Sequence, residues 1–308
     1  MAADQPLALP RWLQGRIEAE AARFLFGSCG ARPDFSVPAG EPALAAPDSV
    51  SWRVFKNPIA LFIGGVAAVV LELAEPRVRS GVWDRTSFRD DPVRRLQRTG
   101  LAAMMTVYGP RPEAEAMIAR VRHLHSRIAG RTASGQAYRA DDPELLNWVH
   151  ATAAFGFVEA YSRFVQPLSS ADITRFYAEG EPAARLYGAT AGPRSEAELH
   201  SLFDAMRPKL QPSPIVFEFL GIMGRAPILP AVLRPFQRLL VRAATDMLPD
   251  WSRALLTLNS EWELKNWERR LVRGAGGIAD RIPLAGSPAV EACRRLSLPE
   301  DYLFKGRG

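Results

Sequence analysis

The stretch "DDPVRRLQRTG" (residues 90–100) carries a clear helix-start signal and decides how the surrounding chain is interpreted. Asp91 stands directly before Pro92, so a side chain that can accept hydrogen bonds from free backbone N–H groups precedes a proline at the first helical position. The same signal recurs in "DDPELLNWVHAT" (residues 141–152). Both stretches therefore predict the first turn of a long α-helix.

The rest of the chain extends this helical pattern. From Trp52 onward apolar residues recur at helical spacing, and no stretch alternates in the manner of a strand. The beginning of the chain contains a short amphipathic segment, Trp12–Phe26, and then a loop rich in proline and glycine. We therefore predict an all-α fold of eight to ten α-helices. Residues 1–50 are expected to form an N-terminal helix and a wrapping loop, and residues 51–308 a single helical domain.

The composition is that of an ordinary globular protein, with 47% apolar and 23% charged residues. The net charge is +6, but the arginines are interspersed with acidic residues, which makes a nucleic-acid partner unlikely. The two cysteines, Cys29 and Cys293, lie outside any CxxC or CxxCH pattern, which disfavours a disulfide framework, a zinc knuckle and covalently attached haem. The N-terminus lacks the pattern of a secretory signal, so we expect a cytoplasmic protein.

Two apolar segments raise the question of a membrane. The run Pro58–Leu71 is shorter than the roughly 18 residues that a spanning helix needs, so it predicts a buried core helix. Residues 208–249 are rich in proline and large apolar side chains. This segment can pack against the helical body, line a channel for an apolar ligand, or make a peripheral membrane contact. Packing is the favoured interpretation, because exposed apolar surface is costly.

Four histidines are candidates for chemistry. His125 lies on the apolar stripe of residues 117–128, whereas His123 points away from that stripe. His150 lies at the margin of an apolar stripe on its own helix, and His200 stands in a polar stretch. A single histidine on an apolar face is either a hydrogen-bonded core residue or a ligand, and the helical pattern alone leaves both open.

The helix that begins at Pro92 carries an unusual face. Arg95, Arg98 and Thr99 occupy positions i, i+3 and i+4, and the small residues Ala102 and Thr106 continue the same side. Such a face leaves room for something flat or elongated beside two guanidinium groups. It is equally compatible with a solvated basic surface whose arginines pair with the preceding aspartates.

Several linked motifs in a fixed order resemble one family. The region from residue 52 to residue 187 is similar to the domain shared by rubber oxygenase (latex-clearing protein) and the MpaB oxygenases. The stretches that carry the likeness are "WRVFKNPIALFIGGVAAVVLELAEPRVRSGVWDRTSFRDDPVRRLQRTG" (52–100), "ARVRHLHSRIAG" (119–130) and "DDPELLNWVHAT" (141–152). The resemblance implies an all-α fold with a globin-like core around a b-type haem.

The resemblance also implies roles for individual residues. Rubber oxygenases place an arginine, a lysine and a threonine over the distal face of the haem, with the spacing RxxKT, and a later histidine ligates the iron. By position these are Arg95, Arg98 and Thr99, with His125 as the ligand and His150 as the alternative. Arg98 replaces the lysine, and a guanidinium has no lone pair for iron. Arg95 and Arg98 are therefore expected to contact the cofactor, either at a haem propionate or at bound dioxygen.

The function implied by the resemblance is oxidative cleavage of a C=C bond to two carbonyls. We expect a small apolar substrate, such as an isoprenoid-like alkene, together with dioxygen and, in some schemes, an electron donor. Glu72 or Glu75 is the candidate acid or base. The alternative is a non-catalytic helical protein that binds haem or lipid. Metal-dependent hydrolysis through His123, His125 and His150 is disfavoured, because residues i and i+2 do not share a helix face.

Overall fold

The all-α prediction is confirmed. A computed structural model describes residues 5–7, 10–27, 32–83 and 91–305, and over these it contains fourteen α-helices, three short 3₁₀ helices and one two-stranded antiparallel hairpin. The longer elements are α1 Arg11–Phe26, α3 Pro58–Ala74, α5 Pro92–Tyr108, α6 Arg111–His125, α7 Pro143–Phe164, α8 Ser170–Tyr187, α9 Glu196–Met206, α10 Pro214–Arg225, α11 Arg234–Asp246 and α13 Asn266–Ala279. The shorter ones are α2 Val50–Phe55, α4 Pro76–Trp83, α12 Asp250–Leu255, α14 Pro288–Arg295, η1 Arg207–Lys209, η2 Ala231–Leu233, η3 Ser260–Trp262, β1 Ala129–Arg131 and β2 Ala137–Arg139.

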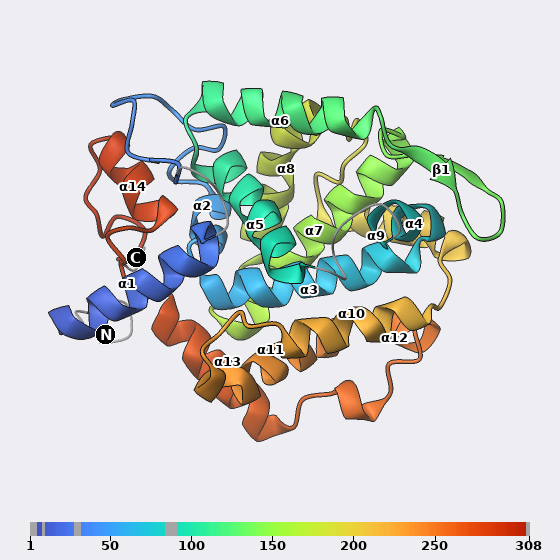
Figure 1. Cartoon of the computed structure of the whole chain (residues 1–308). Helices are drawn as coiled ribbons and strands as arrows, with labels where there is room; N and C mark the ends of the chain where they lie inside the picture. The colour runs from blue at the N-terminus through green and yellow to red at the C-terminus, as the bar shows by residue number, and fades with distance from the viewer. Residues whose placement is uncertain (1–4, 8–9, 28–31, 84–90, 306–308) are drawn as a thin grey trace.

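Helix α3 runs through the middle of the molecule, with α5 and α6 on one side of it and α10 and α11 on the other (Figure 1). It packs along α7, and the two backbones approach most closely at Gly64 and Gly156. A Cβ atom on Gly64 would lie 2.6 Å from the carbonyl oxygen of Gly156, and a Cβ on Gly156 would lie 2.3 Å from that of Gly64. Neither helix tolerates a side chain at this crossing, so glycine is what permits the central helix pair.

The predicted helix starts are confirmed in detail. The Asp91 side chain accepts a hydrogen bond from the Arg94 backbone N–H at 3.1 Å, and α5 begins at Pro92. The Asp142 side chain accepts one from the Glu144 N–H at 2.9 Å. The capping side chains therefore fix where α5 and α7 begin, and with them the direction in which the faces of α5 point.

The structure has more elements than the eight to ten helices expected. The additional helices α2, α4, α12 and α14 are only six to eight residues long. They are shorter than the window over which helical periodicity can be recognised. The hairpin was missed for the same reason, since its two strands have three residues each.

The long loop before α2 is held to the body by one buried side chain. Arg295 of α14 is 1% exposed and donates to the backbone oxygens of Phe35 (2.5 Å), Glu41 (2.8 Å) and Tyr108 (2.7 Å). The loop, the C-terminal helix and the end of α5 thus share one guanidinium. The wrapping loop and the domain division at residue 50 both stay predictions.

A second buried polar cluster joins the start of the helical core to its end. The Lys56 ammonium, with a 4% exposed side chain, donates to the Asp280 carboxylate at 2.8 Å and to the Asp280 carbonyl at 2.7 Å. The Tyr161 hydroxyl donates to the same carboxylate at 3.1 Å. Burial lowers the pKa of Lys56, and Asp280 opposes that effect. Asp280 therefore compensates a charge that the surrounding apolar core would otherwise exclude.

The apolar segment 208–249 forms α10, η2 and α11. Its inner residues, among them Val216, Phe219 and Leu240, are buried, and both α10 and α11 pack against α3. The packing interpretation is confirmed for this inner face. No described helix is by itself long and apolar enough to span a membrane; α3 and α4 meet that test only together, across a bend of 114°.

Candidate functional site

The structure places Arg95, Arg98 and Thr99 on α5. Arg95 is half-buried, while Arg98 and Thr99 are exposed. Among the described residues, neither guanidinium forms a hydrogen bond or an ion pair, and Asp91 serves the α5 backbone instead. Asp90 lies outside the described residues. Burial lowers the pKa of Arg95, while the nearby Glu72 opposes that effect; because an arginine keeps its charge, the face is positively charged.

Glu72 of α3 lies close to this face. It is half-buried, and burial raises its pKa from 4.5 to about 7, against the opposing effects of Arg95 and of a hydrogen bond with Thr152 of α7. Thr152 is itself fully buried. At neutral pH the Glu72 carboxyl is therefore close to half-protonated, which is the condition for a group that both gives and takes a proton.

His125 is the last residue of α6 and is half-buried. Burial and the nearby Arg95 charge lower its pKa, while Asp141 opposes them. The imidazole is thus neutral at pH 7, and within the described part of the chain no hydrogen bond occupies its ring nitrogens. A neutral imidazole with a free nitrogen lone pair is a suitable ligand for a metal centre.

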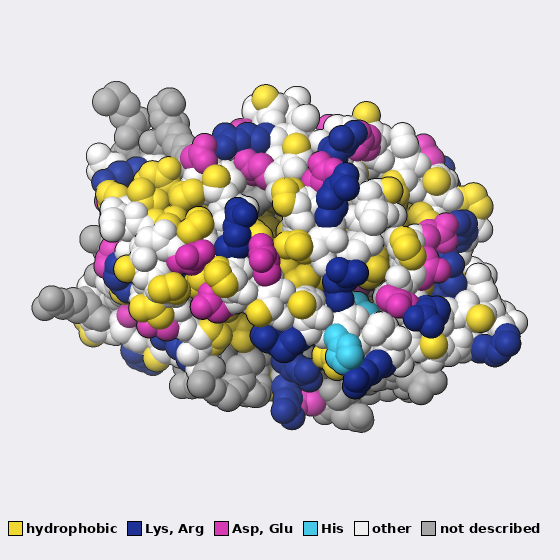
Figure 2. Space-filling model, turned by 90° about the horizontal axis from the view of Figure 1, so that it is seen from above, with side chains coloured by type: hydrophobic (Ala, Val, Ile, Leu, Met, Phe, Trp, Pro, Cys, Tyr) yellow, Lys and Arg dark blue, Asp and Glu magenta, His cyan; other side chains and the backbone are white. Residues whose placement is uncertain are grey.

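Four helices therefore contribute one polar group each to a common region, which we call the arginine site: Glu72 from α3, Arg95 from α5, His125 from α6 and Thr152 from α7. Arg95 is common to two of these groups, because its charge lowers the pKa of both Glu72 and His125. Figure 2 looks down on the α6 side of the molecule and shows histidine side chains next to a group of lysine or arginine side chains on this face.

The family comparison fits this arrangement. The family described as "ER-bound oxygenase mpaB/B'/Rubber oxygenase, catalytic domain" matches residues 52–280, about three quarters of the chain. The chain belongs to this oxygenase family. No curated protein and no solved structure matches the chain. The family match extends from the region that carries the resemblance, residues 52–187, through α13.

Glu75, the other predicted acid or base of this oxygenase-family chain, has a structural role. It is 1% exposed, and its carboxylate accepts hydrogen bonds from Arg77 Nε at 2.6 Å and from the Val78 backbone N–H at 2.8 Å. These bonds hold the first turn of α4. Of the two glutamates, Glu72 is the one that the structure brings to Arg95.

His150, the alternative ligand, lies apart from the arginine site. Its ring faces Gly180 of α8 and Gly192, where an added Cβ would lie 2.7 Å from the imidazole. Burial alone lowers its pKa to about 4, with no contribution from Arg95. His123 and His200 are exposed. The described residues also contain no group of three or more His, Cys, Asp and Glu side chains placed to hold a metal ion.

The apolar surroundings differ from the expectation in one respect. The apolar stripe whose margin carries His150 consists of Leu146, Val149, Ala153 and Phe157. It is only half-buried, while the opposite side of α7 is buried. Helix α7 is apolar on nearly every side, so periodicity could not tell which side lies deepest. A partly uncovered apolar stripe is therefore present on the helix that also contributes Thr152.

At the far end of the α5 face, Thr106 contacts Tyr187, a residue that the sequence did not indicate. The Thr106 hydroxyl donates to the Ala102 carbonyl at 2.8 Å and lies 2.9 Å from the Tyr187 hydroxyl, which in turn lies 3.9 Å from Met117 Sδ. Burial raises the pKa of Tyr187, so its hydroxyl stays protonated. Tyr187 ends α8 far along the chain, and no local motif marks it.

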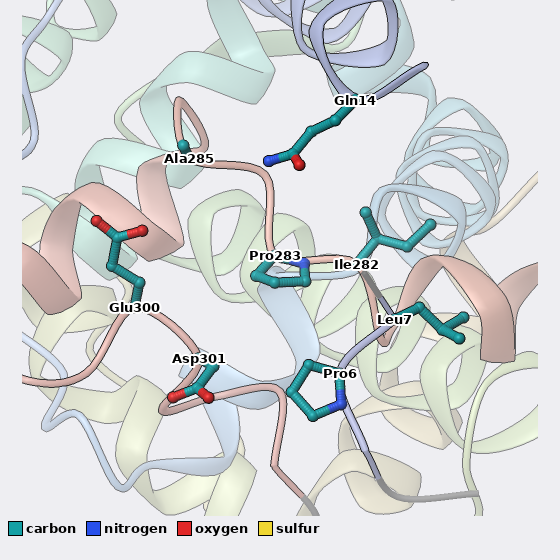
Figure 3. A pocket seen from close by; sticks show the side chains of 8 residues that line it. All are labelled: Pro6, Leu7, Gln14, Ile282, Pro283, Ala285, Glu300 and Asp301. Atoms are coloured by element: carbon teal, nitrogen blue, oxygen red, sulfur yellow. The ribbon is translucent and has the colours of Figure 1, made fainter. Parts of the chain in front are cut away.

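The residues of the arginine site fit a haem by their chemistry. His125 would bind the iron through its neutral imidazole, and Arg95 and Arg98 would bind the haem propionates. Two cavities of about 410 Å³ each lie elsewhere. One is formed between Leu7 in the N-terminal segment and Pro283 near the C-terminus (Figure 3), and the other lies beside Arg242.

Proposed function

We propose that the chain is a haem b-dependent oxygenase that cleaves a C=C bond of a small apolar substrate, such as an isoprenoid-like alkene, to two carbonyls. The observation that carries the proposal is the position of Arg95, whose charge acts on both a neutral histidine and a glutamate with a pKa of about 7. Membership in the oxygenase family supports the reaction class. Dioxygen is the second substrate, and an electron donor is an additional partner if the iron must be reduced.

In this proposal His125 holds the haem through its neutral imidazole, and Arg95 and Arg98 bind either the propionates or the dioxygen side of the pocket. A bound haem supplies the binding and activation of dioxygen. Thr99, which is exposed beside Arg98, adds a hydroxyl at the edge of the same face. Arg95 and Arg98 would bind such anionic groups through charge-assisted hydrogen bonds, because neither guanidinium has an ion pair with a described residue.

In this proposal Glu72 is the group that accepts and returns a proton during the reaction. Its carboxyl is close to half-protonated at neutral pH, so it can take a proton at one Oε atom and return it without a change in pH.

Absorption spectroscopy tests the proposal. The purified chain, supplied with haemin if necessary, is expected to show a Soret band and a positive pyridine haemochrome reaction. His125→Ala should abolish haem retention, whereas His200→Ala, a matched change at an exposed histidine, should leave it intact. A folded chain that refuses haemin contradicts the proposal. If His150→Ala removes haem and His125→Ala does not, the ligand is His150.

The second candidate is a non-catalytic protein that binds haem or lipid. Two observations favour it: Arg98 stands where rubber oxygenases have a lysine, and its side chain is exposed. Oxygen consumption by the reduced haem protein with unsaturated substrates distinguishes the two candidates. Uptake of dioxygen with formation of two carbonyl products supports the oxygenase; haem binding without uptake supports the second candidate.

A further inference from the structure

Helix α13 presents an apolar stripe to the outside. Trp267 is 60% exposed, Leu271 49% and Ile278 56%, and their spacing places all three on one side of the helix. The opposite side is fixed against the body, since a Cβ on Gly276 would lie 2.2 Å from the Phe164 carbonyl oxygen. The stripe therefore cannot turn inward without loss of this packing.

The same face is positively charged. Arg270 lies beside the stripe, and within the described residues it has no ion pair. Arg273 is also exposed; its Nε donates to the Arg163 carbonyl at 3.1 Å, which leaves its charge uncompensated. The one acidic residue of α13, Glu268, is buried and pairs with Arg242 at 2.7 Å. The outer face of α13 thus combines an apolar stripe with unbalanced arginines.

A neighbouring turn repeats this combination. Val232 and Leu233 of η2 are 81% and 45% exposed, and the exposed Arg234 and Arg238 follow them at the start of α11. Helix α11 packs against α13, and both lie along the lower edge of the molecule in Figure 1. Two elements on one side of the fold therefore carry apolar residues next to exposed arginines.

We propose that this side, formed by α13 and the η2 turn, binds the surface of an anionic phospholipid bilayer. A helix with exposed Trp and aliphatic residues next to arginines matches an interfacial helix, whose apolar side enters the headgroup region while its cations meet lipid phosphates. Tryptophan prefers that boundary because its ring is apolar and its N–H is polar. The proposal is independent of haem and of the oxygenase reaction.

A second copy of the chain is a poorer occupant. A two-fold dimer through this face would bring Arg270 and Arg273 of one protomer towards the same residues of its partner. The exposed side of α13 contains no acidic residue to compensate them. Like charges at the centre of an interface oppose association, whereas an anionic bilayer removes the conflict.

Vesicle flotation tests the proposal with the full chain. Vesicles of phosphatidylcholine alone and of phosphatidylcholine with phosphatidylserine serve as probes, at low and high salt. The protein is expected to float with the anionic vesicles, to do so less at high salt and to stay in solution with the neutral ones. Removal of one arginine, as in Arg270→Gln, should weaken binding about fivefold, and Trp267→Ala should weaken it at both salt concentrations.

Matched controls come from exposed residues on other helices. Trp12→Ala on α1 removes a 67% exposed tryptophan, and Arg120→Gln on α6 removes an exposed arginine that has no ion pair with a described residue. Both should bind vesicles as the unchanged chain does, and thermal unfolding should show that every variant is folded. The proposal fails if the unchanged chain does not float, or if the controls lose binding as much as the α13 variants. It also fails if sedimentation shows a dimer that Trp267→Ala converts to a monomer.

Discussion

Replacement of Glu72 by glutamine is expected to stabilise the protein above pH 7 and to flatten its stability profile below that pH. Burial raises the Glu72 pKa from 4.5 to about 7, which at 1.36 kcal/mol per pH unit corresponds to about 3 kcal/mol. Between these two values the folded chain binds more protons than the unfolded chain, so the free energy of unfolding falls as the pH rises. Glutamine stays neutral and avoids this loss.

Urea unfolding of Glu72→Gln and of the unchanged chain at intervals from pH 5 to pH 9 measures the effect. The two free energies of unfolding should diverge from about pH 5 upward and run parallel above pH 7, with the variant more stable by up to about 3 kcal/mol. Glu75→Gln is the matched control on the same helix end. It weakens the ion pair with Arg77 and the cap of α4, so it should destabilise the protein. Parallel curves for Glu72→Gln and the unchanged chain over the whole range would refute an enclosed carboxyl with a raised pKa.

Two further predictions concern the body of the fold. Gly156→Ala should destabilise the chain by about 1–3 kcal/mol, because the added methyl group meets the α3 backbone. Gly65→Ala adds a methyl group that meets nothing within 4 Å, so it should stabilise α3 by about 0.5–1 kcal/mol. Thermal unfolding of both variants measures the two effects. Asp280→Ala should cost about 3–5 kcal/mol, because the buried Lys56 ammonium loses its carboxylate, while Glu181→Ala in an exposed ion pair should cost less than about 1 kcal/mol. Denaturant unfolding measures the loss of stability in both variants. Similar losses for Asp280→Ala and Glu181→Ala would contradict the prediction.

The parts of the fold that could be predicted are those with local signals. Asp91 and Asp142 cap the helices whose starts they predicted, and the apolar run that begins at Pro58 forms the central helix. Capping depends on residues two or three positions apart, so it is visible in the sequence. The all-α class follows from the same signals, repeated along the chain.

The arginine site could be predicted only in part. Arg95, Arg98 and His125 share faces of two successive helices, which helical spacing and the family resemblance both indicate. The choice of Glu72 over Glu75 depends on where Glu72 of α3 lies relative to Arg95 of α5 and Thr152 of α7. The hydroxyl next to Thr106 belongs to Tyr187, which is 81 positions away in the chain. Contacts between distant segments leave no periodic signal, so only the folded structure identifies them.

The cost of the arginine site is itself an argument for a ligand. Glu72 interrupts the most apolar helix of the chain, and its enclosure works against the stability of the protein above pH 7. Arg95 is half-buried beside it, yet no ion pair joins Arg95 to any described residue. Groups that only stabilise a fold satisfy one another, as Lys56 and Asp280 do. The arginine site combines a carboxyl whose pKa is raised, an imidazole whose pKa is lowered and an arginine without an ion pair among the described residues. Such a combination is typical of sites at which a bound ligand supplies the missing partners.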